Sequence, residues 1–136
     1  MVFMKIDHIG IATRGIDEAS RFWREDVGLE PSETEEVVEQ KVRVMMLPIG
    51  ESRIELLEAT SPDSPIARFL EKRGPGIHHV AIRVDNIYAA LEQFKQQGAR
   101  LIDSAPRQGA NGCLVAFVHP SSAGGVLLEL VENRSR

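Results

Sequence analysis

The hexapeptides DHIGIA (residues 7–12) and HHVAIR (residues 78–83) decide the fold, because each is an apolar run with a histidine in the equivalent place. These histidines, His8 and His79, are 71 residues apart (79 − 8 = 71). Each run predicts a β-strand, and each is followed by a stretch with helical spacing of apolar residues. The repeat therefore predicts a duplicated structural unit in which both copies carry a metal-binding side chain.

The first half of the chain predicts one strand, one helix and two or three further strands. The expected elements are a strand at 5–12, a helix at 17–25, a strand at 41–47 that ends before Pro48, and a strand at 53–58. The acidic segment 33–39 has five carboxylates in seven residues, which indicates an exposed strand end or a loop.

The second half repeats this order after a Pro- and Gly-rich crossover at about 61–76. The expected elements are a short helix at 66–72, a strand at 77–84, a helix at 86–97, and strands at 100–103, 114–118 and 126–132. The fold class is therefore α+β. We expect a single domain over residues 1–136, with one module at about 4–60 and a second at about 77–133.

Composition excludes several classes of protein. The 136 residues are 43% hydrophobic and 26% charged, which is typical of one globular domain. The net charge of −4 offers no broad basic surface, so we expect no nucleic-acid partner. No apolar run approaches the length of a membrane span, and the start lacks the pattern of a signal peptide. Together with the single cysteine, Cys113, these features predict a cytoplasmic protein.

Two glutamates complete the chemical repeat. Glu55 and Glu129 each lie in an apolar run, IELLE (54–58) and LELVE (128–132), where an unpaired charge is costly. Helices cover one face of each sheet, so the opposite face is free to carry His8, His79 and both glutamates. Two imidazoles and two carboxylates suit a borderline divalent ion, and we expect one Co²⁺, Zn²⁺, Ni²⁺ or Mn²⁺.

Other candidate residues have plainer interpretations. His78 points to the strand face opposite His79 and predicts a packing role. His119 precedes Pro120 and predicts a turn cap, with a substrate-loop role as the alternative. Cys113 has no base near it in the sequence, which argues against nucleophilic catalysis. The basic residues that meet an anionic ligand cannot be chosen from spacing, so the substrate-binding residues stay unknown.

Three segments carry a resemblance to a known family. DHIGIA (7–12), SPIA (64–67) ahead of GIHHVA (76–81), and HP (119–120) ahead of GGVLLEL (124–130) resemble methylmalonyl-CoA epimerases of the vicinal oxygen chelate superfamily, which also contains glyoxalase I and extradiol dioxygenases. The similarity extends from about residue 5 to 132. It implies two βαβββ modules forming an incomplete barrel around one divalent ion, with Co²⁺ favoured, and a homodimer that acts on an acyl-CoA.

The resemblance also implies residue roles. The metal ligands would be His8, Glu55, His79 and Glu129, and the reaction would interconvert (R)- and (S)-methylmalonyl-CoA through an enolate. Exchange of a proton on both faces of C2 requires two acid/base groups. Glu129 is the first candidate, and Glu55 is the second.

The second base is where this chain departs from some epimerases, which carry a glutamate on the third strand. The aligned residue is Val44, which cannot transfer a proton. Glu36 and Glu39 of the acidic segment are further candidates. Two rival functions stay open: glyoxalase I, whose ligands are also two histidines and two glutamates, and a non-catalytic small-molecule binding protein.

Overall fold

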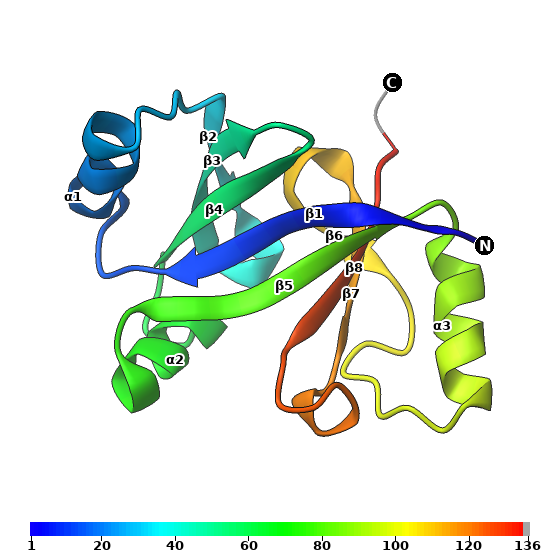
Figure 1. The fold of residues 1–136 in the computed structure, drawn as a ribbon. Helices are drawn as coiled ribbons and strands as arrows, with labels where there is room; N and C mark the ends of the chain where they lie inside the picture. The colour runs from blue at the N-terminus through cyan, green and yellow to red at the C-terminus, as the bar shows by residue number, and fades with distance from the viewer. Residues whose placement is uncertain (135–136) are drawn as a thin grey trace. The chain divides into compact units, whose positions relative to one another are not determined.

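The protein contains two compact units, which are described separately below. The structure is a computed structural model that describes residues 1–134 (Figure 1). The N-terminal unit comprises residues 8–78, and the C-terminal unit comprises residues 1–7 together with the chain from 79 onward. In the described chain no helix is both long enough and apolar enough to span a membrane.

The N-terminal unit has the predicted strand, helix and strands. Its elements are β1 (Phe3–Ala12, of which residues 8–12 belong here), α1 (Ile16–Arg21), β2 (Glu33–Val37), β3 (Val42–Ile49), β4 (Ser52–Ala59) and α2 (Pro65–Arg73). A π-helical turn (Phe22–Asp26) prolongs α1, so the two together cover the predicted helix 17–25. The strand order is β2-β3-β4-β1, in which β1 and β4 are parallel.

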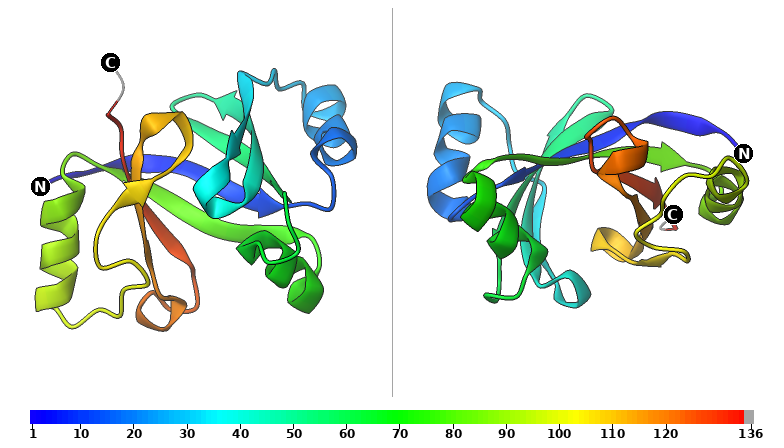
Figure 2. Two further views of the ribbon diagram at one scale, coloured as in Figure 1. Left: turned by 180° about the vertical axis from the view of Figure 1, so that it is seen from behind. Right: turned by 90° about the horizontal axis from the view of Figure 1, so that it is seen from below.

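The C-terminal unit repeats this order. It contains the end of β5 (Gly76–Val84), α3 (Ile87–Gln96), β6 (Arg107–Gln108), β7 (Leu114–Val118) and β8 (Leu128–Glu132). The strand order is β5-β8-β7-β6, with β5 parallel to β8. Each half therefore has βαβββ topology, and the predicted α+β class is confirmed. Figure 2 shows α3 and the β7–β8 hairpin from two further sides.

The acidic segment takes the first of its two predicted alternatives, since Glu33–Val37 forms the largely exposed strand β2 against β3. Two predicted boundaries are wrong. Pro48 does not end β3, because β2 pairs with β3 only as far as Met46 and leaves the proline at a free edge, where its missing N–H costs nothing. The strand expected at 100–103 is reduced to one bridge from Leu101 to Val118, and the paired segment is the two-residue β6.

The first residues of β1 are tied to the C-terminal unit. The backbone N–H of Val2 donates to the Asp85 carboxylate at 2.7 Å, and Arg83 forms an ion pair of 2.8 Å with Asp7. Phe3 stacks on Phe94 of α3, with 6.1 Å between the ring centroids. The chain therefore has a second boundary between the two units, inside β1 between residues 7 and 8, in addition to the one expected near the crossover.

Apolar packing holds each helix to one face of its own sheet. Ile16 of α1 packs in a buried cluster with Met45, Leu47 and Leu56. In the C-terminal unit the equivalent cluster consists of Val84, Ile87, Ala90, Leu91, Ala116 and Leu130. Side chains alternate between the two faces along a strand. The residues next to those in the clusters therefore point to the face that the helix does not cover.

A glutamate at the end of each last strand begins the helix of its module. The Glu58 carboxylate accepts a hydrogen bond of 2.8 Å from Ile16 N, and the Glu132 carboxylate accepts one of 2.9 Å from Ile87 N. Both bonds satisfy an N–H that has no partner within the helix, and both place negative charge at the positive end of the helix dipole. The repeated Glu of the two terminal strands is thus a helix-capping device.

We predict that Glu132→Ala lowers the free energy of unfolding by about 1 kcal/mol, because α3 loses this carboxylate. The midpoint of thermal unfolding should fall by roughly 3–4 °C. The matched control is Glu92→Ala, since Glu92 is exposed on the same helix and should shift the midpoint by less than about 1 °C. Equal midpoints for the two variants would exclude a capping role for Glu132.

Candidate functional site

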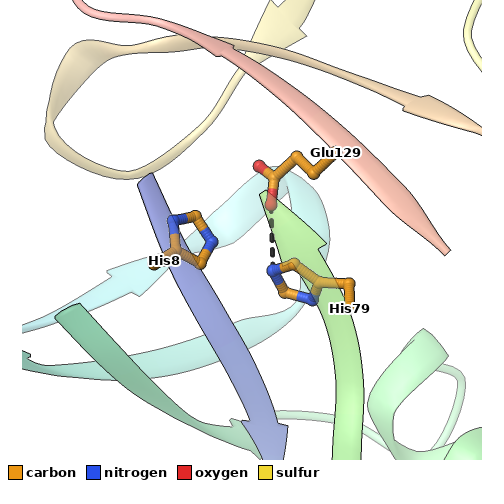
Figure 3. Close-up of side chains that lie close together, drawn as sticks. All are labelled: His8, His79 and Glu129. Atoms are coloured by element: carbon orange, nitrogen blue, oxygen red, sulfur yellow. Dashed lines mark ion pairs between the residues drawn. The ribbon is translucent and has the colours of Figure 1, made fainter. Parts of the chain in front are cut away.

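Each unit carries one buried histidine–glutamate pair on the sheet face that its helix does not cover. In the N-terminal unit His8 Nε2 lies 3.3 Å from Glu55 Oε1. In the C-terminal unit His79 Nε2 lies 2.9 Å from Glu129 Oε1 (Figure 3). All four side chains are at most 7% exposed. All four residues are buried, as expected from their positions in apolar runs, and their pairing within each unit was not predicted.

The strand register explains why the pairs form. Gly10 of β1 lies opposite Glu55 of β4, and Ala81 of β5 lies opposite Glu129 of β8. Each histidine is two residues before its small neighbour, so it shares that neighbour's face. The absence of a bulky side chain at Gly10 and Ala81 leaves room beside the carboxylate for the imidazole. The equivalence of the two halves therefore extends to single residue positions.

The donor set suits a metal ion. Each unit's pair offers one imidazole nitrogen and one carboxylate oxygen, from His8 and Glu55 in the first unit and from His79 and Glu129 in the second (Figure 3). Imidazole nitrogen and carboxylate oxygen are ligands that Zn²⁺ and its neighbours in the first transition row accept. Buried carboxylates are costly without a compensating positive charge, and a divalent ion would provide it.

The N-terminal pair also has a positive neighbour in the protein. Arg53 Nε donates to Glu55 Oε2 at 2.7 Å from two residues earlier on β4. The guanidinium side chain is 19% exposed, so solvent only partly screens this ion pair. No corresponding arginine precedes Glu129, because Leu127 occupies that position. The two carboxylates therefore have different electrostatic surroundings.

The third strand of each unit contributes apolar side chains to the same face. Met46 lies opposite Glu55, and Phe117 lies opposite Glu129. The Phe117 ring meets the His79 ring edge to face, with centroids 5.7 Å apart. Val44 is two residues before Met46, so it shares this face and is 3% exposed. The position that lacks a carboxylate thus lies on the same face as the histidine–glutamate pair.

The acidic segment supplies a carboxylate that the sequence analysis did not choose. Glu35 lies opposite Val44 in the β2–β3 ladder, so its side chain shares the face of Val44 and Glu55. Glu36 lies opposite Arg43 and points to the other face, and Glu39 is exposed in a 3₁₀ turn. Only the β2–β3 register shows which of these glutamates faces the site, because a shift of one residue moves every side chain of β2 to the other face of the sheet.

The remaining candidates have structural roles. The His78 ring packs edge to face on Phe69 at 5.1 Å, which confirms the predicted packing role. His119 Nδ1 accepts a hydrogen bond of 3.0 Å from Ser121 N, which confirms the predicted turn cap. Cys113 is buried in an apolar cluster with Ala81, Val115 and Val131.

The chain belongs to the glyoxalase/bleomycin resistance protein/dioxygenase superfamily, whose family model matches residues 7–117. This result confirms the predicted fold, which is that of the vicinal oxygen chelate proteins.

The most specific similarities are to epimerases. The mitochondrial methylmalonyl-CoA epimerase of Mus musculus is 39% identical over 93% of this chain and 71% of its own. An uncharacterised protein, YqjC of Bacillus subtilis, is 43% identical over 94% of this chain and 91% of its own. A solved structure of methylmalonyl-CoA epimerase in complex with methylmalonyl-CoA and NH4+ has 37% identity and a TM-score of 0.95, covering 98% of this chain and 97% of that one. The resemblance to methylmalonyl-CoA epimerases is thereby confirmed.

We predict that His79→Ala weakens Co²⁺ binding by more than about 100-fold, because loss of a partner that only orients a ligand already costs about 10–100-fold. Calorimetric titration of metal-free protein measures this. The matched control is His78→Ala, the adjacent residue on the opposite strand face, which should still bind one ion per chain. Unchanged binding in His79→Ala would remove His79 from the ligand set.

Proposed function

We propose that the protein is a methylmalonyl-CoA epimerase that interconverts the (R) and (S) forms of its substrate. The observation that carries the proposal is the duplicated buried His–Glu pair in a chain that matches epimerases in sequence and fold over nearly its full length. Malonyl-type thioesters with a longer branch, such as ethylmalonyl-CoA, would present the same reacting group.

In this proposal His8, Glu55, His79 and Glu129 ligate one divalent ion, with Co²⁺ as the first choice and Zn²⁺, Ni²⁺ or Mn²⁺ as alternatives. When bound, the ion supplies Lewis-acid stabilisation of the negative charge that develops on the thioester oxygen. The protein's own side chains hold the substrate and move the proton. The apolar side chains of Met46, Phe117 and Val44 exclude water.

The reaction requires that one C–H bond breaks and that another forms on the opposite face of C2. Glu129 accepts the C2 proton, and the electron pair of that bond delocalises into the thioester carbonyl. The second carboxylate returns a proton to the other face, and we assign Glu55 as its first candidate. The hydrogen bond from Arg53 Nε to Glu55 Oε2 holds this carboxylate in place and leaves Oε1 beside His8.

Glu35 replaces Glu36 and Glu39 as the alternative second base from the acidic segment. It lies on β2 beside Val44, the position at which some epimerases carry a glutamate, and it shares the face of Glu55. If the Glu35 side chain extends across Val44, its carboxylate lies near the place that a glutamate at position 44 would occupy.

Two further proposals concern the assembly and its location. We propose a cytoplasmic homodimer, and the location agrees with a chain that has one buried cysteine, Cys113, and so uses no internal disulfide. The exposed apolar side chains of Val2, Met4 and Ile6, at the start of the chain and in β1, provide surface that a second copy would bury. Size-exclusion chromatography with light scattering measures the molecular mass of the assembly directly.

Two activity assays on the same metal-loaded protein test the function. Incubation with (R)-methylmalonyl-CoA should produce an equal mixture of both epimers. Addition of methylglyoxal and glutathione should produce no thioester absorbance at 240 nm. The reverse pattern would establish glyoxalase I, whose donor set is the same. Inactivity in both assays with substrate bound would establish the non-catalytic binding alternative.

We predict that Glu129→Gln lowers kcat for epimerisation by at least about 100-fold, because an amide cannot accept the C2 proton. Its affinity for Co²⁺ should fall by a smaller factor, since the amide oxygen is still a ligand. Steady-state kinetics and metal titration of the same preparation measure the two effects. A kcat within threefold of the wild-type value would exclude Glu129 as a base.

We predict that Glu35→Gln and Glu36→Gln differ in their effect on kcat if the acidic segment contributes the second base. The first should lower kcat by at least about tenfold, and the second, on the opposite face of the same strand, should leave it unchanged. Equal rates for both variants and the wild type would exclude Glu35 and leave Glu55 as the assigned partner of Glu129.

A further inference from the structure

We propose that Arg107 binds the free carboxylate of the substrate, so that it selects 2-carboxylated acyl thioesters over ordinary acyl thioesters. This inference rests on the proposed function and names the residue that recognises the group next to the reacting carbon. All the residues that carry it belong to the C-terminal unit.

Arg107 lies on the same sheet face as the His79–Glu129 pair. It pairs with Val115 in the β6–β7 ladder, and Val115 pairs with Val131, two residues after Glu129. Residues opposite each other in a ladder share a face, and so do residues two apart on one strand. The guanidinium carbon lies 5.6 Å from the centroid of the Phe117 ring, whose own edge-to-face partner is His79.

Neighbouring groups hold this guanidinium in one place. Asp103 Oδ2 accepts a hydrogen bond of 2.8 Å from Phe117 N, which anchors that carboxylate to β7. Its other oxygen, Oδ1, lies 3.3 Å from Arg107 Nε. The Phe117 ring adds a cation–π contact to the same guanidinium. A fixed guanidinium loses less conformational entropy on binding a ligand than a mobile surface arginine does.

Space for the short β6 segment depends on a glycine. An added Cβ at Gly109 would lie 2.6 Å from a methyl carbon of Val115, closer than real Cβ atoms approach. A side chain there would push the segment away from β7. Gly109 therefore allows the segment that carries Arg107 to lie close against the face of the His79–Glu129 pair.

The hydrogen-bonding state of Arg107 differs from that of another partly buried arginine of this unit. Arg83 donates to Asp7 through Nε at 3.0 Å and also contacts it through Nη2 at 2.8 Å, so that its charge already has a well-aligned carboxylate. Arg107 Nε is buried 3.3 Å from Asp103 Oδ1, but the two make no well-aligned hydrogen bond in the described chain. This weaker pairing leaves the guanidinium with hydrogen-bonding capacity that a ligand carboxylate would use.

Charge complementarity identifies the ligand class. The face holds the carboxylate of Glu129, which repels a second carboxylate brought in by the substrate. A malonyl-type thioester therefore needs a positive group beside its carboxylate, and the planar guanidinium matches a carboxylate in a bidentate arrangement. The 38% exposure of the Arg107 side chain leaves it accessible to such a ligand.

The test compares two thioesters that differ only in the carboxylate, malonyl-CoA and propionyl-CoA, by calorimetric titration of metal-loaded protein. Wild-type protein should bind malonyl-CoA more tightly. Arg107→Met should weaken malonyl-CoA binding by about 10–100-fold and change propionyl-CoA binding by less than about twofold. Arg107→Lys should lose part of this preference, and the control Arg100→Met, an exposed position of the same unit, should lose none.

The outcomes separate this inference from the proposed function. If the wild-type protein prefers malonyl-CoA and Arg107→Met keeps that preference, Arg107 does not read the carboxylate. If Arg107→Met weakens both thioesters equally, the guanidinium binds the coenzyme phosphates, and the inference is also overturned. If the wild-type protein binds neither thioester, the proposed function itself is wrong. Circular dichroism of each variant checks that it is folded.

Discussion

The alternation of side chains along one strand is the constraint on which both the fold and the site depend. In the last strand of each module two glutamates are three residues apart, Glu55 and Glu58 in one and Glu129 and Glu132 in the other. An odd spacing places them on opposite faces of the sheet. One carboxylate pairs with a histidine, and the other accepts the first N–H of the module's helix. The three-residue spacing within one five-residue segment therefore separates the carboxylate of the candidate site from the carboxylate that caps the helix.

The same register shows where the two halves have diverged. Glu35 and Arg107 occupy equivalent places, each opposite a valine of the third strand, Val44 or Val115. The backbone repeat is retained there, but one half carries a carboxylate and the other a guanidinium. An epimerase needs such a difference, since its substrate is not symmetric: one side must exchange a proton and another must hold an anion. In the proposed function, duplication supplies the repeated ligands, and divergence at these positions supplies the selectivity.

Sequence alone predicted the repeat, most strands and helices, and the four buried residues His8, Glu55, His79 and Glu129, because periodic apolar spacing and charge in an apolar run are local signals. It failed where the structure depends on pairing between segments. The acidic segment was expected to be an exposed strand end or a loop, and it forms β2, but the residue on the face of Glu55 is Glu35 rather than Glu36. Arg107 could not be chosen from spacing, because its proposed role depends on its contacts with Asp103 and Phe117. Strand pairing brings Phe117 next to it, and a loop brings Asp103. These contacts are set by register, which a single sequence does not reveal.

The central claim is that two acid/base groups exchange the C2 proton on both faces of a malonyl-type thioester. The most direct measurement is nuclear magnetic resonance of (R)-methylmalonyl-CoA in D₂O with Co²⁺-loaded protein, followed for both deuterium content and stereochemistry. The account predicts that the C2 proton is replaced by deuterium while the thioester becomes an equal mixture of epimers. Exchange with retained configuration would contradict it, because a single base would then be acting on one face alone.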